Sequence, residues 1–230
     1  MSTIATKIKD LRIRRGLTQG EVADALGISR PTFVSIEDGK RELNISELNR
    51  MASVLNISTG DLLYDVAQIP TDDFGLNKYK QIILNTLKYG TDSDGKITKT
   101  KLAKLVYLSD FAWYYDHLVS MSGLQYRRIP QGPVPDAYFR VIEELYEDES
   151  IDVSCSGKAF MVKLNEQPDA SELSKEELSL IKKIGKVWEG KKTKQIVDFT
   201  HDQLPWKICR PGEIIPYELI TQEDPDHVYC

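Results

Sequence analysis

Residues 17–41 read LTQGEVADALGISRPTFVSIEDGKR and predict two short helices joined by a tight turn. Thr18 and Glu21 form a Thr-x-x-Glu capping box, in which each side chain satisfies a free backbone N–H group at the start of the first helix. Gly27 permits the positive φ that a sharp turn requires. Ser29 is a good N-cap for the second helix, because its side-chain oxygen can accept a hydrogen bond from the first turn.

A short helix, a turn that contains glycine and a second helix that opens with small polar and basic residues are typical of a helix-turn-helix. Phe33 and Ile36 lie three residues apart on the second helix, so we expect both to face the core. The opposite face then meets the major groove of DNA. The candidate DNA-binding residues on and around this face are Gln19, Arg30, Pro31, Thr32, Ser35, Lys40 and Arg41.

The chemistry of these side chains indicates how each could contact DNA. Arg30 can donate two hydrogen bonds to guanine O6 and N7, and the methyl group of Thr32 can pack on a thymine methyl. Gln19 lies at the start of the first helix, where its amide and the free backbone N–H groups can bind a phosphate. Lys40 and Arg41 follow the second helix and can neutralise another stretch of the DNA backbone.

The sequence predicts two domains separated by a linker. Residues 1–66 form a five-helix domain, in which Ser46 caps the fourth helix and Ser58 caps a short fifth helix. Residues 67–76, AQIPTDDFGL, interrupt the helical periodicity with proline, aspartate and glycine, which is typical of a linker. Residues 77–230 form the larger domain.

The larger domain is predicted to be helix-rich with a small β-hairpin, which makes the fold class mainly α. Its helices are expected at residues 77–89, 99–119, 136–147, 174–189, 193–200 and 216–221. Residues 151–155 and 160–164 are predicted to pair as the hairpin. The glycine- and proline-rich stretch 120–135 is expected to be a stiff loop.

The residue types that could carry catalysis or bind a metal form no recognised pattern. Cys155, Cys209 and Cys230 are too far apart for a Cys-x-x-Cys pair, the three histidines lack metal-ligand spacing, and there is no glycine-rich phosphate loop. We therefore expect neither enzymatic activity nor a cofactor. An enzyme would be favoured only if His201 and Asp110 lay together at the floor of a deep pocket.

The charge pattern predicts a cytoplasmic protein that acts as a dimer. No apolar export signal opens the chain, and charged side chains interrupt the longest apolar tract, 102–119, as expected of a core helix. The net charge is −5, and residues 1–65 hold nine basic and nine acidic residues. Because such a neutral domain binds DNA weakly alone, we expect a homodimer on a palindromic operator.

Aromatic and arginine side chains of the larger domain are candidates for a protein interface, because Tyr, Trp and Arg are enriched at interface hot spots. The candidates are Tyr126, Arg127, Arg128, Tyr138 and Trp206. Arg127 and Arg128 are adjacent in sequence, so we expect that at most one of them faces inward.

Residues 4–64 are similar to the Xre/Cro-like helix-turn-helix family. The markers include Thr18-Gln19, Gly27, Ile36-Glu37 and Gly39. The resemblance implies that the family's DNA contacts fall on Gln19, Arg30, Pro31, Thr32, Ser35 and Lys40. Pro31 stands where the family often has a polar residue, so contact through shape or a methyl group would have to replace a hydrogen bond there.

Residues 78–220 resemble the Panacea (SocA-like) antitoxin domain, through KLVYLSDF at 104–111, GPV at 132–134 and THDQLPW at 200–206. This resemblance implies a protein that binds and neutralises a toxin encoded beside it. Some members of the family carry a helix-turn-helix at the N-terminus, and one relative acts as a proteolytic adaptor, so the mode of neutralisation stays open. The toxin would then be the partner of the candidate protein interface.

The sequence therefore predicts an antitoxin that neutralises a cognate toxin from its own operon and represses that operon by binding operator DNA. The alternative is a phage- or prophage-type transcriptional regulator, whose C-terminal domain senses a ligand or mediates dimerisation. A neighbouring short reading frame that is toxic alone would favour the first hypothesis over the second.

Overall fold

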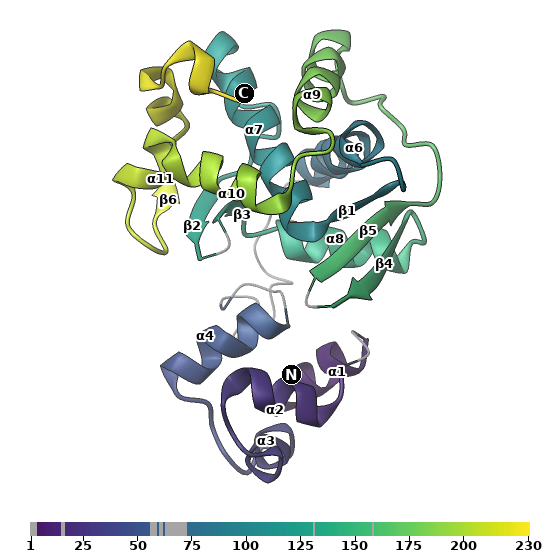
Figure 1. Ribbon diagram of the computed structural model, residues 1–230, viewed down its shortest axis with the longest axis vertical. Coiled ribbons are helices and arrows are strands. Elements are labelled where there is room, and N and C mark those ends of the chain that lie inside the picture. The colour runs from purple at the N-terminus through teal and green to yellow at the C-terminus, as the bar shows by residue number, and fades with distance from the viewer. Residues whose placement is uncertain are drawn as a thin grey trace. The chain divides into compact units, whose positions relative to one another are not determined.

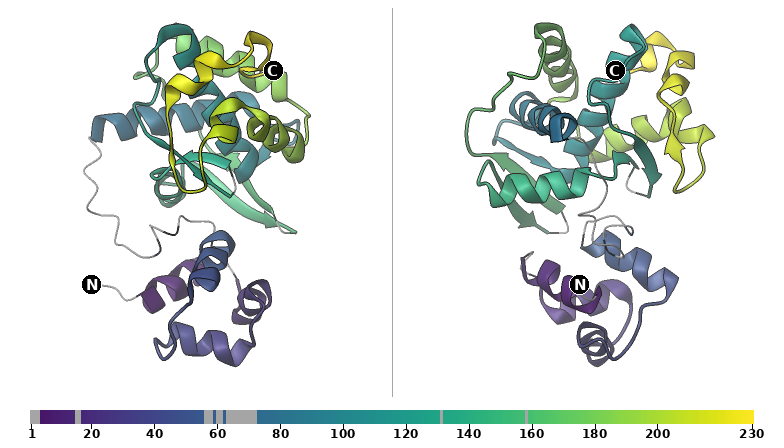
Figure 2. Two further views of the ribbon diagram at one scale, coloured as in Figure 1. Left: turned by 90° about the vertical axis from the view of Figure 1, so that its left-hand side faces the viewer. Right: turned by 180° about the vertical axis from the view of Figure 1, so that it is seen from behind.

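The computed structural model describes residues 4–14, 17–55, 59, 62, 73–130, 132–157 and 159–230. The chain divides into two compact units, Met1–Pro70 and Thr71–Cys230 (Figures 1 and 2). Helices make up most of the secondary structure, which confirms the mainly α fold class. The expected cap of a fifth helix at Ser58 and the expected linker residues 67–72 lie outside the described residues.

Short helices around one apolar core form the first unit. They are α1 (Ile4–Arg14), α2 (Gln19–Leu26), α3 (Arg30–Glu37) and α4 (Ile45–Val54). Apolar side chains from all four helices and from the residues that follow α4 fill the core and are at most 2% exposed: Ile8, Val22, Leu26, Phe33, Ile36, Met51, Leu55 and Leu62. The predicted inward positions of Phe33 and Ile36 are thereby confirmed.

Caps define where these helices begin. The capping box predicted for α2 is present, with the Thr18 N–H donating to Glu21 Oε2 at 2.7 Å and the Glu21 N–H donating to Thr18 Oγ1 at 3.2 Å. The predicted cap of α4 is wrong, because Asn44 rather than Ser46 forms a capping box with Glu47. Ser46 lies within α4, where its hydroxyl accepts a hydrogen bond from Arg50 at 3.2 Å.

The second unit is built around helix α7 (Lys99–His117), which runs through its middle (Figure 1). Every residue from Lys101 to Ala112 is buried. Helices α6 (Asp73–Gly90), α9 (Lys175–Trp188) and α10 (Thr193–Asp202) pack against α7. The buried central helix that the sequence predicted is therefore confirmed.

The remaining helices are α8 (Tyr138–Glu147), α11 (Leu204–Ile208) and the 3₁₀ helices η1 (Tyr217–Gln222) and η2 (Pro225–His227). Helices α8 and η1 follow predicted segments with shifted ends, and η2 was not predicted. Helix α6 begins at Asp73, so residues 73–76 belong to that helix and not to the predicted linker. The short helix α11 was not predicted, although Pro205 lies in its first turn, where proline is tolerated.

Two small antiparallel sheets complete the second unit (Figure 2). The first confirms the predicted hairpin and adds a strand to it, in the order β1 (Lys96–Thr98), β5 (Ala159–Leu164) and β4 (Ile151–Ser156). The second has the order β3 (Gly132–Pro135), β2 (Tyr126–Ile129) and β6 (Ile214–Ile215).

The second sheet corrects the prediction that residues 120–135 form only a loop. Pro133 and Pro135 fit this sheet because β3 is an edge strand, where a missing N–H donor breaks no ladder. Tyr126 pairs with Pro135 on one side and with Ile215 on the other, so β6 joins the sheet from a distant part of the chain.

Helices α6 and α9 approach so closely that a side chain would not fit between them. A Cβ atom on Gly185 would lie 2.4 Å from the Tyr89 carbonyl oxygen, and backbone at this position cannot rotate away. At Gly90 a Cβ would clash with the Leu105 side chain, at 2.6 Å, which can move, and would lie in ordinary contact, 3.9 Å, with the Gly185 Cα. The two glycines therefore differ in how much a methyl group should cost.

We predict that Gly185→Ala lowers the free energy of unfolding of the second unit by about 1–3 kcal/mol, the usual range for overpacking. Gly90→Ala should cost less, since a side chain can adjust. Urea unfolding followed by tryptophan fluorescence measures this unit, because all three tryptophans lie in it. Equal stability of both variants and the wild type would contradict the close approach.

Candidate nucleic-acid interface and partner surface

The turn between α2 and α3 is held in a fixed shape. Gly27 has φ 70°, the left-handed conformation, and its N–H caps the end of α2. Arg50 Nη1 donates a hydrogen bond of 2.8 Å to the carbonyl oxygen of Leu26, the last residue of α2. The angle between the two helices is thus fixed by the backbone turn and by a side chain from α4.

The N-terminal end of α3 presents the candidate base-reading residues. Arg30 and Pro31 are exposed, and Thr32 and Ser35 are half-buried. The Thr32 hydroxyl lies 2.8 Å from Ser29 Oγ and the Ser35 hydroxyl donates to the Pro31 carbonyl oxygen at 3.1 Å. Because these hydroxyls already have partners, the methyl group of Thr32 and the guanidinium of Arg30 are the groups best placed to meet bases.

A buried polar cluster ties α1, α2 and α3 together behind this surface. Arg12 Nε donates to Glu37 Oε1 at 2.6 Å, and Gln19 Nε2 donates to Glu37 Oε2 at 2.9 Å. The side chains of Arg12 and Glu37 are 11% and 2% exposed. Gln19 is thus oriented from inside the unit, which fixes one of its two amide hydrogens and leaves the other for a phosphate.

Lys40 and Arg41, the candidate phosphate contacts after α3, both have acidic partners. Lys40 Nζ lies 2.9 Å from Asp38 Oδ2, and this hydrogen bond lowers the pKa of the Asp38 carboxyl. Arg41 Nη2 lies 2.8 Å from Oε1 of the buried Glu47 and is the main cause of the lowered pKa of that carboxyl. Lys40 is exposed and can exchange partners, whereas Arg41 is half-buried and stabilises the start of α4.

Burial corrects two of the residues predicted for a protein interface in the second unit. Tyr126 and Tyr138 are 0% and 1% exposed, so their rings belong to the core and not to a surface. The Tyr138 hydroxyl donates to the Lys99 carbonyl oxygen at 2.9 Å, and the Tyr126 ring packs edge-on against Phe111. Residue type alone suggested an interface, but Tyr126 on strand β2 and Tyr138 on helix α8 both point into the core.

The other three interface candidates form one connected structure. The Arg128 guanidinium lies 4.5 Å from the centre of the Trp206 ring and donates to the Cys209 carbonyl oxygen. Arg127 Nη2 lies 3.0 Å from Asp136 Oδ2 and Arg127 Nη1 donates to the Gly212 carbonyl oxygen at 2.8 Å. Both arginines are half-buried.

Trp206 also stacks against a histidine. The rings of Trp206 and His201 stack at 4.0 Å with an interplanar angle of 1°. His201 Nε2 is buried and has no hydrogen-bond partner among the residues that the structure describes. Burial, together with the positive charges of Lys104 and Arg128, lowers the pKa of His201 to about 4.

Lys104 lies next to this histidine under strand β3. It is 0% exposed, and burial lowers its pKa to about 7. Gly132 has φ 115°, a conformation that favours glycine, and a Cβ atom there would lie 1.5 Å from Lys104 Nζ and 3.3 Å from His201 Nε2. Lys104, Gly132 and His201, one from each of the three stretches that resemble the Panacea domain, therefore lie close together in the fold.

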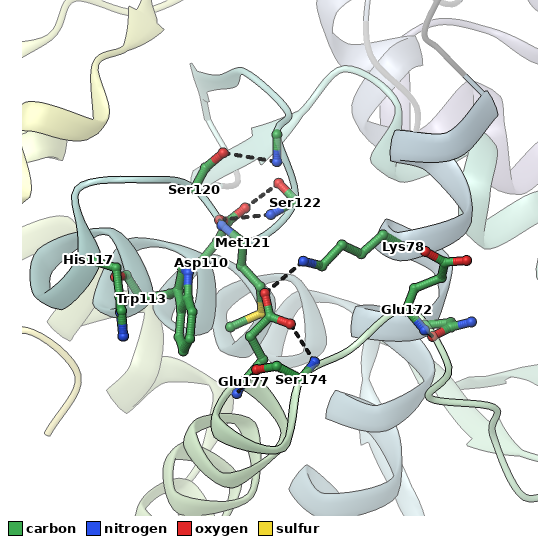
Figure 3. Close-up of polar contacts among 12 residues, drawn as sticks. Lys78, Asp110, Trp113, His117, Ser120, Met121, Ser122, Glu172, Ser174 and Glu177 are labelled. Atoms are coloured by element: carbon green, nitrogen blue, oxygen red, sulfur yellow. Dashed lines mark hydrogen bonds and ion pairs between the residues drawn. The ribbon is translucent and has the colours of Figure 1, made fainter.

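Asp110 organises a separate buried site at the other end of α7 (Figure 3). Its Oδ1 accepts hydrogen bonds from the N–H groups of Met121 at 2.8 Å and Ser122 at 3.2 Å, and the Ser122 hydroxyl donates to its Oδ2. The Tyr217 hydroxyl lies 2.9 Å from the same Oδ2. Burial raises the pKa of Asp110, and these hydrogen bonds oppose the rise.

Asp110 and His201 thus make their contacts with different residues. Their contacts do not bring the Asp110 and His201 side chains together, as the enzyme hypothesis would require. Among the described residues, no three His, Cys, Asp or Glu side chains gather as a metal ion would require. In the same part of the chain, no helix combines the length and apolarity needed to cross a membrane.

The fixed α2–α3 turn and the exposed tip of α3 define the first unit as a helix-turn-helix of the DNA-binding class. Residues 8–62 match the helix-turn-helix family, and residues 102–207 match the family described as antitoxin SocA-like, Panacea domain. The chain therefore belongs to the helix-turn-helix regulators and carries a Panacea domain in its second unit. Helix-turn-helix and antitoxin-like domains are in general not enzymes.

Similar proteins are regulators too. The cryptic phage CTXphi transcriptional repressor RstR of Vibrio cholerae is 30% identical over 61 residues, 26% of this chain and 55% of that protein. The SPbeta prophage-derived HTH-type transcriptional regulator YonR of Bacillus subtilis is 29% identical over 102 residues, 44% of this chain and 87% of YonR.

An HTH-type transcriptional regulator of Archaeoglobus fulgidus is 35% identical over 57 residues, 25% of this chain and 81% of that protein. The chain spans about half the length of the Vibrio cholerae repressor that it matches. No solved structure matches the chain.

We predict that Glu37→Gln destabilises the first unit by about 3 kcal/mol, because it leaves the largely buried charge of Arg12 without a carboxylate, although Arg12 Nη1 still donates to the Leu17 carbonyl oxygen. Glu42→Gln is the matched control, since Glu42 is exposed and a surface change costs less than about 0.5 kcal/mol. Urea unfolding followed by circular dichroism measures both variants. A loss as small as that of the control would mean that the Arg12–Glu37 pair does not stabilise the unit.

We predict that the second unit becomes more stable as the pH rises from 7 to 9. The folded pKa of Lys104 is about 7 and the ordinary value is 10.5, so between them the unfolded chain holds a proton that the folded chain lacks. The free energy of unfolding then rises with pH by up to about 1.4 kcal/mol per unit. Lys104→Met should remove this slope and Lys163→Met, an exposed control, should keep it. Urea unfolding at each pH, followed by tryptophan fluorescence, measures the slope, and identical slopes in both variants would contradict the prediction.

Proposed function

We propose that this chain is a non-enzymatic antitoxin that binds and neutralises a cognate protein toxin and represses its own operon. The first unit would bind the operator, and the second unit would bind the toxin. One observation carries the proposal: a recognition helix with an exposed Arg30-Pro31-Thr32 tip and an antitoxin SocA-like Panacea domain occur in a single chain. A protein that binds operator DNA works where the DNA is, so we place it in the cytoplasm.

The operator half of the proposal is supported by the geometry of α3. Arg30 is exposed at the first position of the helix, and the helix is fixed on its inner side by Phe33 and Ile36. An arginine in this place can recognise one guanine through two hydrogen bonds. Gln19 and Lys40 would add phosphate contacts on either side of the groove. We further propose a homodimer on two half-sites, since few phosphate contacts come from each copy.

The toxin half rests on the Panacea match. Among the predicted interface residues, the half-buried Arg127 and Arg128 stay as candidates, whereas Trp206 is buried and could act only by supporting Arg128. The side chain of Arg127 is 36% exposed and Trp206 is 9% exposed, so Arg127 is the more accessible of the two. Neutralisation by direct binding or by delivery to a protease would use the same kind of surface.

A second candidate function is a phage- or prophage-type regulator whose second unit senses a ligand or mediates dimerisation. Two of the similar proteins are a phage repressor and a prophage-derived regulator. The buried, unpartnered Nε2 of His201 beside Lys104 is the feature of the second unit that a small ligand could satisfy. A neighbouring gene whose product is not toxic would favour this candidate.

We predict that Arg30→Ala weakens operator binding by about 1–3 kcal/mol and relaxes the preference at one base pair. Fluorescence anisotropy with operators that differ by single base pairs measures both effects. Arg210→Ala is the matched control, because Arg210 is exposed in the second unit. Unchanged preference at every base pair would remove Arg30 from the reading surface.

The same variant separates the two halves of the function in cells. Cells that express the neighbouring toxin should grow with wild-type protein and with Arg30→Ala, while an operator reporter should be repressed by wild type alone. Loss of growth with Arg30→Ala would place toxin binding in the first unit. Failure of the wild type to restore growth would overturn the antitoxin assignment.

A further inference from the structure

The second unit carries a row of exposed lysines that the proposed function leaves without a role. Residues 182–194, KKIGKVWEGKKTK, hold six lysines and one glutamate, although the whole chain has a net charge of −5. We call the exposed lysines at the end of α6 and along α9 and its following turn the lysine ridge. They are Lys88, Lys182, Lys183, Lys186, Lys191 and Lys192.

Aromatic rings show that several members of the lysine ridge lie close together. Lys88 Nζ of α6 and Lys182 Nζ of α9 lie 5.3 Å and 5.8 Å from the centre of the same Tyr89 ring. Lys191 Nζ lies 4.4 Å from the centre of the Trp188 ring. Lys88 and Lys182 therefore lie close together across two packed helices, and Lys191 lies beside Trp188 at the end of α9.

The ridge lysines differ in their surroundings: a hydrogen bond to Tyr229 is the main cause of the raised pKa of Lys183, and the charge of Asp116 adds to it. Within the described residues, no ion pair involves Lys182, Lys186 or Lys191, in contrast to Lys194, which lies 2.5 Å from Asp198. Screening confines each charge to a range of about 8 Å at physiological salt, so the local surplus sets the field here and the net charge does not.

In the first unit, by contrast, several basic side chains already have partners within the protein. Arg12 and Arg41 are paired with Glu37 and Glu47, and Arg50 is bound to the end of α2. Lys40 must leave Asp38 before it can bind a phosphate. Operator binding by this unit alone would thus release few counterions and be weak.

We propose that the lysine ridge binds the phosphate backbone of DNA beside the operator and adds affinity that does not depend on base sequence. Lysine suits this role, because it is a flexible point charge that binds phosphate without strict geometry. Lysine is depleted at protein–protein interfaces, so a nucleic acid fits the ridge better than an acidic protein does. The inference rests on the proposed operator binding, and it adds a second contact surface to it.

The salt dependence of DNA binding by the full chain tests this inference. Lys182→Gln combined with Lys186→Gln should reduce the slope of log affinity against log salt by about 2, because each lost phosphate contact removes about 0.9. Lys96→Gln combined with Lys163→Gln removes the same charge from paired strands β1 and β5 and should leave the slope unchanged. Anisotropy from 50 to 300 mM NaCl, on operator and scrambled duplexes, measures the slopes.

The outcomes are distinct from those of the operator test. The ridge variant should lose affinity equally on operator and scrambled DNA and keep its base preference, whereas Arg30→Ala should change the preference. An unchanged slope in the ridge variant would overturn the inference, even where Arg30 reads a base. An unchanged slope with failed rescue from the toxin would assign the ridge to an acidic protein partner and would also overturn it. Equal urea midpoints of the variants and the wild type control for folding.

Discussion

The burial of α7 is the constraint on which the second unit depends. From Lys101 to Ala112 no residue of this helix faces water, so each charged side chain on it must find a partner within the protein. Lys101 pairs with Asp92 at 3.1 Å, and Asp92 in turn accepts the Gly190 N–H at 2.8 Å. Asp110 takes its donors from the segment after α7 and from η1. The polar groups of one helix thus hold distant loops in place.

Local signals are what the sequence predicted well. Capping boxes and alternating strands involve neighbours in sequence, so the starts of α2 and α9 and the β4–β5 hairpin could be derived without a structure. Strand β2 could not, because it pairs with β6, some ninety residues later, and with a strand whose glycine and prolines are typical of a loop. Asn44 and Ser46 are both good caps, but only Asn44 has a glutamate three residues later, and the capping box with Glu47 places the start of α4 there.

The residues of the candidate sites also fall into those that local patterns predicted and those that depend on distant contacts. Helical periodicity around Phe33 and Ile36 predicted that Arg30 and Pro31 would be exposed, since the inner face determines the outer one. Periodicity could not reveal the acidic partners of Lys40 and Arg41, which come from turns and from another helix. Residue type alone placed Tyr126 and Tyr138 at an interface, but a tyrosine fits a core equally well once its hydroxyl is satisfied, as that of Tyr138 is.

An acidic chain can bind DNA because attraction depends on charges within a screening length of the phosphates, and not on the sum over the molecule. Two additions to the weakly charged first unit can raise its affinity, and they act through different physics. Dimerisation raises the effective concentration of a second reading helix, so its gain depends on protein concentration. A cationic surface on the same chain releases more counterions, so its gain depends on salt and is present in every monomer. The proposed lysine ridge belongs to the second kind, and it would hold the chain near DNA without adding to the base contacts proposed for Arg30.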